Sequence, residues 1–229
     1  MPGGEGQARA AGGHRSPGQR PSGLGKAGAG ENTVYDVLIG DAEAREAILS
    51  TGYGTLDLIP TAIELAGAEI ELVGVENRET LLKNALQELR GDYDAIFIDC
   101  PPSLSLLTIN ALTAADSVLI PIQCEYYALE GLGQLMNTVK LMRKKLNPNL
   151  TIEGILLTMF DSRTNLCAQV VQEVRSHFPN ELFETMIPRN VRLSEAPSYG
   201  LPIHLYDARC IGAKAYTELA QELIERKGV

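Results

Sequence analysis

Hydrophobic residues change their spacing repeatedly along this chain, and these changes predict where strands and helices begin and end. Short apolar runs between turn residues predict buried strands, whereas apolar residues at every third or fourth position predict amphipathic helices. Strands are expected at residues 55–61, 95–98, 117–122, 151–160 and 182–187. Helices are expected on both sides of a turn at Gly40-Asp41, the second one capped by Asp41, and at 62–72, 78–90, 103–115, 129–146, 165–178 and 212–227.

The order of these elements predicts the fold class. Strands alternate with helices of roughly 10–18 residues, which is typical of βαβ units. We therefore expect an α/β protein with a doubly wound, mostly parallel sheet flanked by helices. Residues 188–203 contain three prolines, two serines, a glycine and an asparagine, and they are expected to form a loop.

The first 30 residues differ in composition from the rest of the chain. They hold ten glycines and three prolines, and Met1 and Leu24 are their only large apolar residues. Such a segment buries too little surface to offset its ordering entropy. We therefore expect a disordered Gly/Pro/Arg-rich tail over residues 1–30 and an α/β domain over residues 31–229.

Charge and cysteine content narrow the class of protein. The chain has a net charge of −9, and the tail's four basic residues against one acidic residue leave −12 on the domain. An acidic domain argues against uniform nucleic-acid binding, although a local basic patch remains compatible with it. The four cysteines form no Cys-x-x-Cys pair, and no stretch approaches 18 consecutive apolar residues. A reducing cytoplasm is therefore the expected location.

The segment YDAIFIDCPPS, residues 93–103, carries the most chemical information. The apolar run 95–98 stops at Asp99, which predicts a buried parallel strand with a carboxylate at its carboxyl end, where open α/β sheets bind ligands. Pro101-Pro102 then imposes a turn. A carboxylate in this position suits the binding of Mg²⁺ beside a nucleotide, directly or through water. The alternative interpretation is that Asp99 only caps the turn.

Longer stretches of the chain resemble the ParA/Soj family of chromosome- and plasmid-partitioning ATPases. The family's Walker B region is similar to YDAIFIDCPPSLSLLTINALTAADSVLIPIQCEYYALEGL. Its later signatures are similar to LLTMFDSRTNL and PRNVRLSEAPSYGLPIHLYD, and its earlier part to ENTVYDVLIGDAE and IPTAIELAGAEIELV. The resemblance runs from about Ser22 or Glu31 to the carboxyl terminus, and it implies a P-loop NTPase-like α/β domain of the deviant Walker type.

The resemblance also implies cofactors, partners and a location. Family members use ATP and Mg²⁺, dimerise around two ATP molecules, bind DNA nonspecifically as dimers, and are stimulated by a centromere-binding ParB-type protein. We therefore expect a homodimer that binds DNA and a ParB-type protein and associates with the nucleoid in the cytoplasm. No membrane anchor is expected, because the polar face of the last helix carries Glu218, Glu222 and Glu225.

Individual site residues follow from the same resemblance. It implies that Asp99 is the Walker B acidic group near Mg²⁺, that residues 188–190 border the adenine, and that residues 158–161 end the strand facing it. The expected nucleotide-binding residues are Asp99, Thr158, Asp161, Pro188, Arg189 and Asn190. Without the resemblance, Arg189 would be interpreted as a solvated loop arginine.

Several basic residues are candidates for contacts with DNA phosphates. They are Arg163, Arg175, Arg192, Arg209 and Lys214. Each is also compatible with an ordinary surface charge, and only a cluster of them would bind DNA. The last helix begins CIGAKAY where the family commonly has SRGAEAY, so Ile211 replaces an arginine and Lys214 adds a positive charge.

The main departure from the family lies upstream. Family members begin with a strand, a KGGVGKTT-like phosphate loop, a helix and a second strand, and no such sequence precedes Ser22. Gly25-Lys26 is followed by Ala27, which has no hydroxyl for Mg²⁺. We therefore expect a chain that lacks its first strand, P-loop and helix through truncation or a frameshift. It is expected to be catalytically inactive and marginally stable, with a Tm below about 60 °C.

Other functions remain alternatives at this point. One is a non-catalytic ParA-like paralogue that binds DNA or a ParB-type partner. A MinD-type division-site ATPase would need a basic amphipathic membrane helix at its end. A nitrogenase-reductase-like protein would need cluster-binding cysteines, whereas Cys100 and Cys124 are expected to be small, buried apolar residues.

Overall fold

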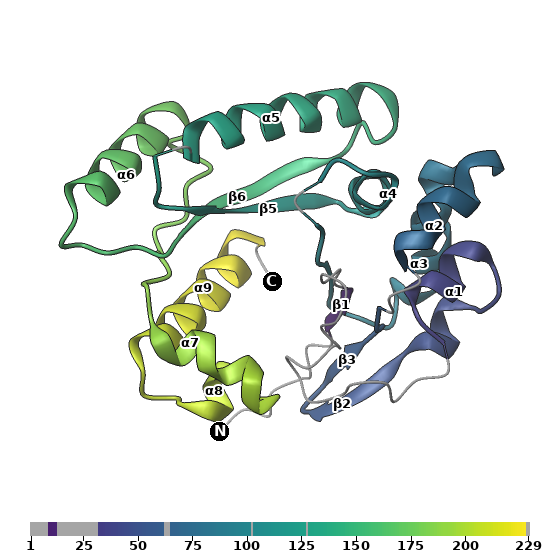
Figure 1. Cartoon of the computed structure of the whole chain (residues 1–229), viewed down its shortest axis with the longest axis horizontal. Coiled ribbons are helices and arrows are strands. Elements are labelled where there is room, and N and C mark those ends of the chain that lie inside the picture. Colours follow the sequence, from purple (N-terminus) through teal and green to yellow (C-terminus); the bar gives the residue numbers. More distant parts are fainter. Residues whose placement is uncertain (1–8, 13–31, 62–64, 102, 127, 228–229) are drawn as a thin grey trace. The chain divides into compact units, whose positions relative to one another are not determined.

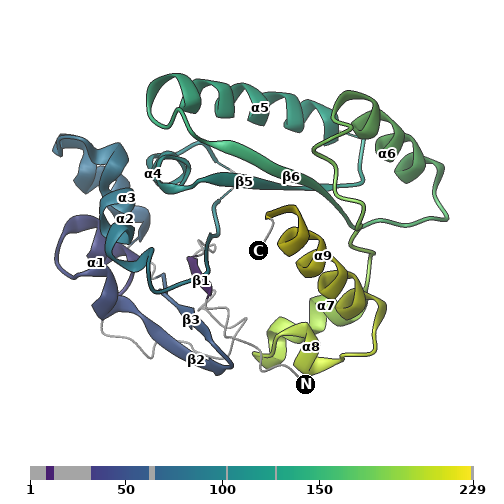
Figure 2. The same cartoon turned by 180° about the vertical axis from the view of Figure 1, so that it is seen from behind.

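The computed structural model describes residues 9–12, 32–61, 65–101, 103–126 and 128–227. The chain divides into two compact units, Met1–Ala115 and Asp116–Val229, and each is described by itself (Figures 1 and 2). In both units, helices pack on a sheet that contains parallel strand pairs. The predicted α/β class with a mostly parallel sheet is therefore confirmed, with the described strands divided between a four-stranded and a two-stranded sheet.

The sheet of the first unit has the order β2-β3-β1-β4. Its strands are β1 (Arg9–Gly12), β2 (Leu49–Tyr53), β3 (Leu56–Leu58) and β4 (Ala95–Ile98). β2 and β3 form an antiparallel hairpin, and β1 is parallel to both β3 and β4. β4 has the bounds that the apolar run predicted. None of its residues is fully buried, however, and Phe97 is exposed, so the expectation of a buried strand was wrong in that respect.

Strand β1 lies in the segment that composition predicted to be a disordered tail. Residues 9–12 pair with β4 along their whole length, with Arg9 opposite Ala95 and Gly12 opposite Ile98. Strand pairing uses backbone groups and requires no apolar side chain, which is why composition did not predict it. The expectation that the chain lacks a first strand beside β4 was therefore wrong. The rest of the segment 1–30, including Ser22–Gly25 and Gly25-Lys26, lies outside the described residues.

The segment between residues 32 and 53 differs from its prediction in its second half. Helix α1 (Val34–Ile39) has a capping box formed by Thr33 and Asp36, and it ends at Gly40 with φ 87°. The second helix expected after Asp41 was wrong, because only a short 3₁₀ turn, η2 (Ala44–Ala47), precedes strand β2. Two glycines with positive φ and the Thr51 hydroxyl, which donates to the Leu56 carbonyl at 2.6 Å, close the β2–β3 hairpin instead.

The helices of the first unit form one apolar core. They are α1, α2 (Leu65–Glu71), α3 (Leu81–Leu86) and α4 (Leu106–Ala114), with the 3₁₀ turns η3 (Leu72–Gly74), η4 (Arg78–Thr80) and η5 (Gln87–Leu89). The predicted stripe on residues 78–90 is confirmed: Leu82, Leu86 and Leu89 are buried, and Leu81 and Ala85 pack against them.

One buried polar side chain joins two of these helices. The Asn110 side chain on α4 is 1% exposed. Its carbonyl oxygen accepts from the Leu82 N–H at 3.1 Å, and its amide donates to the Arg78 and Leu106 carbonyls at 2.7 and 3.1 Å. Asn110 thus supplies an acceptor for the first turn of α3, whose N–H groups have no partner within that helix.

The second unit is built on two parallel strands with helices on both faces. β5 (Ser117–Gln123) pairs with β6 (Thr151–Thr158). α5 (Ala128–Lys145) and α6 (Asn165–His177) cover one face, and α9 (Ile211–Lys227) covers the other (Figure 1). Successive residues of β6 accordingly enter different clusters, with Ile155 and Leu157 on the side of α5 and α6 and Leu156 on the side of α9.

The chain after α6 runs beside β6 in an extended conformation. The predicted strand 182–187 appears as bridges of Ile155 with Leu182 and of Phe160 with Pro188. The Glu222 carboxylate on α9 accepts from the backbone N–H groups of Glu184 and Thr185, both at 2.9 Å. The Glu222 side chain therefore supplies acceptors for backbone N–H groups that would otherwise lie unpaired along this extended segment.

The loop predicted at residues 188–203 was wrong in part. It contains α7 (Val191–Glu195), η6 (Ala196–Tyr199) and the start of α8 (Ile203–Tyr206). Asn190 caps α7 by accepting from the Arg192 N–H at 2.7 Å, and Gly200 ends η6 with φ 67°. Turn residues here start and stop short helices instead of forming a continuous loop. Within the described part of the chain, no helix is long and apolar enough to cross a membrane.

Candidate functional site

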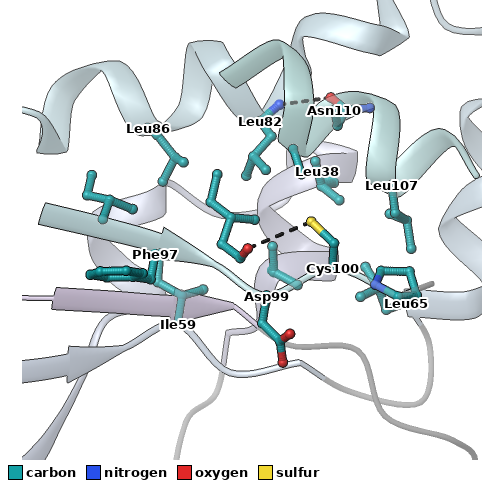
Figure 3. A pocket seen from close by; sticks show the side chains of 15 residues that line it. Leu38, Ile59, Leu65, Leu82, Leu86, Phe97, Asp99, Cys100, Leu107 and Asn110 are labelled. Carbon is teal, nitrogen blue, oxygen red and sulfur yellow. Dashed lines mark hydrogen bonds between the residues drawn. The ribbon is translucent and has the colours of Figure 1, made fainter. Parts of the chain in front are cut away.

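Asp99 lies where the sequence placed it, directly after β4 at the carboxyl end of the strand. Its side chain is exposed, and Figure 3 shows the carboxylate pointing away from the apolar side chains that surround the strand end. The neighbouring Cys100 points the other way, into a cavity, with its sulfur 3.7 Å from the Ile98 carbonyl oxygen. The position of Asp99 agrees with the prediction, and its role in binding metal or nucleotide remains a prediction.

The cavity beside β4 has a volume of about 70 Å³ and lies within the first unit. Apolar side chains from β4, α3 and α4 form much of its lining, among them Ile98, Leu82, Leu86 and Leu107. Cys100 as a residue is exposed, so the expectation of a buried Cys100 was wrong. Desolvation of its thiol among these groups, together with the charge of Asp99, raises the pKa of the thiol to about 11. The Cys100 thiol therefore stays neutral at physiological pH and is a poor nucleophile.

This cavity does not have the chemistry of a phosphate site. A triphosphate needs backbone N–H groups and lysine or arginine side chains at close range, and among the described residues no lysine or arginine lines this cavity. The volume is also far below the roughly 300–1,000 Å³ of ordinary small-molecule pockets. Among the described residues, no group of three or more His, Cys, Asp and Glu side chains is placed to hold a metal ion. The cavity itself thus does not fit Mg²⁺-ATP, and the Asp99 carboxylate points away from it.

The other expected nucleotide-binding residues lie in the second unit, where the end of β6 meets the chain after residue 187. Thr158 is the last residue of β6, and its hydroxyl donates to the Ile122 carbonyl at 3.1 Å. The Phe160 N–H donates to the Ile187 carbonyl, and the Phe160 carbonyl accepts from the Arg189 N–H, both at 3.0 Å. These bonds bring residues 158–161 beside residues 188–190, as the resemblance implied.

A residue with strained backbone lies inside this junction. Met159 has φ 54°, in the left-handed region that non-glycine residues rarely adopt. Such strain persists only where surrounding structure imposes it, here the backbone bonds on either side, and it is common at binding sites. Sequence patterns had not singled out Met159, since nothing in its residue type predicts a positive φ.

Asp161 and Arg163 form an ion pair at the junction, 2.7 Å apart. The Arg163 Nε donates to Asp161 Oδ1 at 2.9 Å and an Arg163 Nη donates to Oδ2 at 2.7 Å, a two-pronged geometry. These bonds, with the nearby positive charge of Arg189, hold the pKa of the Asp161 carboxyl well below its usual range. Asp161 is therefore ionised at every physiological pH.

Most of the predicted DNA-contacting arginines are paired with carboxylates. Arg175 lies 3.3 Å from Glu184, and Arg192 lies 2.8 Å from Glu195 and 3.5 Å from Asp207. Arg209 and Lys214 are exposed, and neither has an ion pair within the part of the chain that the structure describes. The sequence had not predicted these carboxylate partners. They reduce the positive charge that the arginines present to an anion.

Comparison with known proteins relates most of the chain to one group. A family model described as an AAA domain matches residues 19–152. The sporulation initiation inhibitor protein Soj of Bacillus subtilis is 59% identical over 207 residues, which cover 90% of this chain and 82% of that protein. The chromosome partitioning protein ParA of Myxococcus xanthus is 55% identical over 194 residues, which cover 85% of this chain and 69% of that protein.

Solved structures agree in fold. A cobyrinic acid a,c-diamide synthase from Mycobacterium smegmatis, with bound ATP analogue and magnesium, is 34% identical with a TM-score of 0.80, covering 97% of this chain and 83% of that one. Apo McdA from Cyanothece has a TM-score of 0.81 at 19% identity, over 95% of this chain and 88% of that one, and this likeness shows the fold alone.

Proposed function

Because this chain belongs to the ParA/Soj family of chromosome-partitioning ATPases, we propose that it acts in DNA partitioning as a homodimer that binds DNA without sequence specificity. A ParB-type protein would regulate it, and the cytoplasmic nucleoid would be its location. We further propose that the 229-residue chain does not hydrolyse ATP. The family relationship supports the first part of the proposal, and the absence of a phosphate-loop sequence from the 229 residues supports the second.

The observation that carries the lack of hydrolysis is the absence of a phosphate-loop sequence from the 229 residues. The 229 residues contain no G-x-x-x-x-G-K-[ST] sequence. Among the described residues, no cationic side chain lines the cavity at the end of β4. Phosphoryl transfer depends on positioned cations that neutralise charge on the transferred group, and a single carboxylate does not supply them.

We propose that the residues expected to face a nucleotide still contribute to nucleotide binding, although the chain does not hydrolyse ATP. Asp99 would contribute one carboxylate oxygen to Mg²⁺, and Thr158, Asp161 and residues 188–190 would border the base. The hydrogen bonds that join Phe160 to Ile187 and Arg189 fix these segments against each other, which favours a preformed surface. Any nucleotide bound here by the base alone would be bound weakly, since the phosphates supply most of the polar contacts.

Turnover measurements test the catalytic half of the proposal. Phosphate release from Mg²⁺-ATP by the purified 229-residue chain, alone and with DNA and a ParB-type protein, should equal the rate without protein. The matched variant is Asp99→Ala, which should leave that background unchanged. Turnover that disappears in Asp99→Ala would overturn the proposed lack of activity and show that Asp99 acts on a bound nucleotide.

The DNA-binding half is tested separately by titration of a labelled duplex. The expected affinity is sequence-independent and falls steeply as the salt concentration rises, because bound phosphates release counterions. Replacing the exposed Lys214 or Arg209 with alanine should weaken binding to all sequences equally and reduce the salt slope by about one each. Absence of binding at about 50 mM salt would refute DNA partitioning by this chain.

A non-catalytic paralogue that meets DNA or a ParB-type partner is the second candidate. The absence of a phosphate-loop sequence from the 229 residues favours it. The two candidates differ in whether a nucleotide changes DNA affinity. A measured shift of the DNA titration on adding Mg²⁺-ATP supports the nucleotide-dependent partitioning protein, and an unchanged titration supports the paralogue.

A further inference from the structure

The Asp161–Arg163 pair has an arrangement that separates it from the other ion pairs of the second unit. Three N–H groups of Arg163 reach one carboxylate: the backbone N–H and Nε donate to Oδ1 at 3.0 and 2.9 Å, and an Nη donates to Oδ2 at 2.7 Å. The Arg163 side chain is 86% exposed, whereas that of Asp161 is 20% exposed. The guanidinium therefore lies at the surface while the carboxylate that holds it lies mostly beneath.

A carboxylate and a phosphate use the same face of a guanidinium. Both accept two parallel N–H bonds from the arginine fork. While Asp161 accepts from Nε and one Nη, a DNA phosphate has to displace it to obtain the same two bonds, and it also meets the negative charge of Asp161. Because exposed ion pairs are weak, a DNA phosphate can replace Asp161 on the Arg163 guanidinium.

Asp161 also belongs to the junction proposed to face a nucleotide. Its neighbour Phe160 accepts the Arg189 N–H through its carbonyl oxygen, and Thr164, which caps α6, donates its hydroxyl to the Asp161 carbonyl at 3.0 Å. The carboxylates that hold Arg175 and Arg192 lie outside residues 158–161 and 188–190. A movement of the junction that displaces Asp161 would therefore also change its hydrogen bonds to Arg163, which is one of the proposed DNA contacts.

We propose that Asp161 lowers the DNA affinity of this surface by holding the Arg163 guanidinium, and that withdrawal of the Asp161 carboxylate releases Arg163 to a DNA phosphate. The inference rests on the proposed DNA binding. In this inference Asp161 positions Arg163, and the Arg163 guanidinium is the group that contacts DNA.

The alternative role of Asp161 is structural. Oδ1 accepts from the Arg163 N–H two residues on, which forms a turn ahead of α6. Asparagine keeps this acceptor, because its side-chain carbonyl occupies the same position, and it removes the charge and the second oxygen of the fork. Asp161→Asn therefore separates the electrostatic role from the turn, and Asp161→Ser is a second variant that preserves a shorter turn acceptor.

The test is a titration of the full chain into a fluorescent duplex of about 30 base pairs, without nucleotide, between about 50 and 200 mM salt. We expect Asp161→Asn to bind about 5–10-fold tighter at about 0.1 M salt, with a salt slope steeper by about 0.9, since one more phosphate contact releases one more counterion. Asp161→Ser should behave alike. Adding Arg163→Ala to Asp161→Asn should abolish both gains.

Two matched variants control for net charge. Glu225→Gln removes one negative charge from an exposed position on α9, and no ion pair is described for Glu225. Glu218→Gln removes one negative charge from another exposed position on α9, and no ion pair is described for Glu218. Each should change affinity less than about twofold, because long-range charge effects are screened beyond a Debye length of about 10 Å.

The outcomes distinguish this inference from the proposed function. DNA binding by the unmodified chain that is unchanged in both Asp161 variants, or raised equally by Glu225→Gln, overturns the Asp161 inference and leaves DNA binding in place. A gain that survives Arg163→Ala also overturns it. Absence of DNA binding by every variant at about 50 mM salt overturns the proposed function and the inference with it.

Discussion

The two units contain similar apolar strands and bury them to different extents. In β6, Ile155 and Leu157 are 0% exposed and Leu156 is 4% exposed, because helices pack on both faces. In β4 no residue is buried, and Phe97 is 38% exposed. An apolar run therefore predicts that a strand forms, whereas its burial depends on which elements pack against each face.

This difference extends to the strand ends that carry the proposed sites. The end of β6 is fixed by backbone hydrogen bonds from Phe160 to Ile187 and Arg189. The end of β4 borders an apolar cavity of about 70 Å³. Because packing voids lower stability and permit movement, we expect the second unit to hold its site more rigidly than the first.

The largest expected effect comes from removing a phenylalanine from each unit. Phe183 is 0% exposed and its ring lies 4.1 Å from the Arg226 guanidinium, so Phe183→Ala should reduce the free energy of unfolding by about 3–5 kcal/mol. Phe97→Ala is the matched change in the first unit and should cost less than about 2 kcal/mol, since part of the ring is already in water. Urea titrations followed by circular dichroism measure both. Equal losses would contradict the difference in burial.

The next effect concerns the buried polar link of the first unit. Asn110→Ala leaves the Leu82 N–H and the Arg78 carbonyl without their side-chain partner, and each lost partner costs about 1–3 kcal/mol. We expect a loss of about 2–4 kcal/mol in the same urea titration. Asn84→Ala, on the exposed face of α3, is the control and should change stability by less than about 0.5 kcal/mol. A small effect at Asn110 would show that water replaces the lost partner.

A smaller effect on stability is expected when Gly154, in the well-packed strand β6, is replaced by alanine. A Cβ at Gly154 would lie against the Phe183 ring and 2.9 Å from the Glu181 carbonyl oxygen, so Gly154→Ala should cost about 1–3 kcal/mol. Gly131→Ala on α5 meets nothing within 4 Å and should stabilise the chain by about 0.5–1 kcal/mol. Thermal melts of the two variants should therefore shift in opposite directions. A rise in both would mean that the core around Gly154 is looser than described.

Long helices and isolated apolar runs were predicted well from the sequence. α5, α6 and α9 begin and end within one or two residues of their predicted bounds, and β4 matches its run. These segments repeat one period over many residues or stop at a strong turn signal. The segment 41–51 failed because helix-favouring residues around Ala44 precede a hairpin whose turn depends on Gly52 and Gly54 at positive φ, a feature of the backbone.

The candidate site could be predicted only in part. The resemblance identified residues 158–161 and 188–190, and the structure brings them together through the Phe160 backbone. The partners of the arginines were not predictable, because Arg175 meets Glu184 through a turn whose geometry no periodicity describes. A list of basic residues therefore overestimated the positive charge of this surface.

The smallest expected effect compares one thiol from each unit. Burial and the charge of Asp99 raise the pKa of Cys100 to about 11, and burial, followed by the neighbouring Cys167 thiol, raises the pKa of Cys124 to about 12. Because the thiolate is the reactive form, alkylation of either residue should be slow at pH 8 and should accelerate about tenfold per pH unit up to about pH 10. Since Cys100 is exposed and Cys124 is 4% exposed, Cys100 should react first.

Peptide mapping after timed iodoacetamide labelling measures these two rates, with the urea-unfolded chain as the reference for an ordinary thiol. The same raised pKa values set the direction of the stability change. Both thiols favour the folded state below the pKa of the unfolded thiol, and that contribution is lost as the pH rises toward their folded values. Labelling of Cys100 at pH 8 as fast as in the unfolded chain would show that the cavity beside β4 opens freely to solvent, and the contrast between the two units would then be larger than their burial alone indicates.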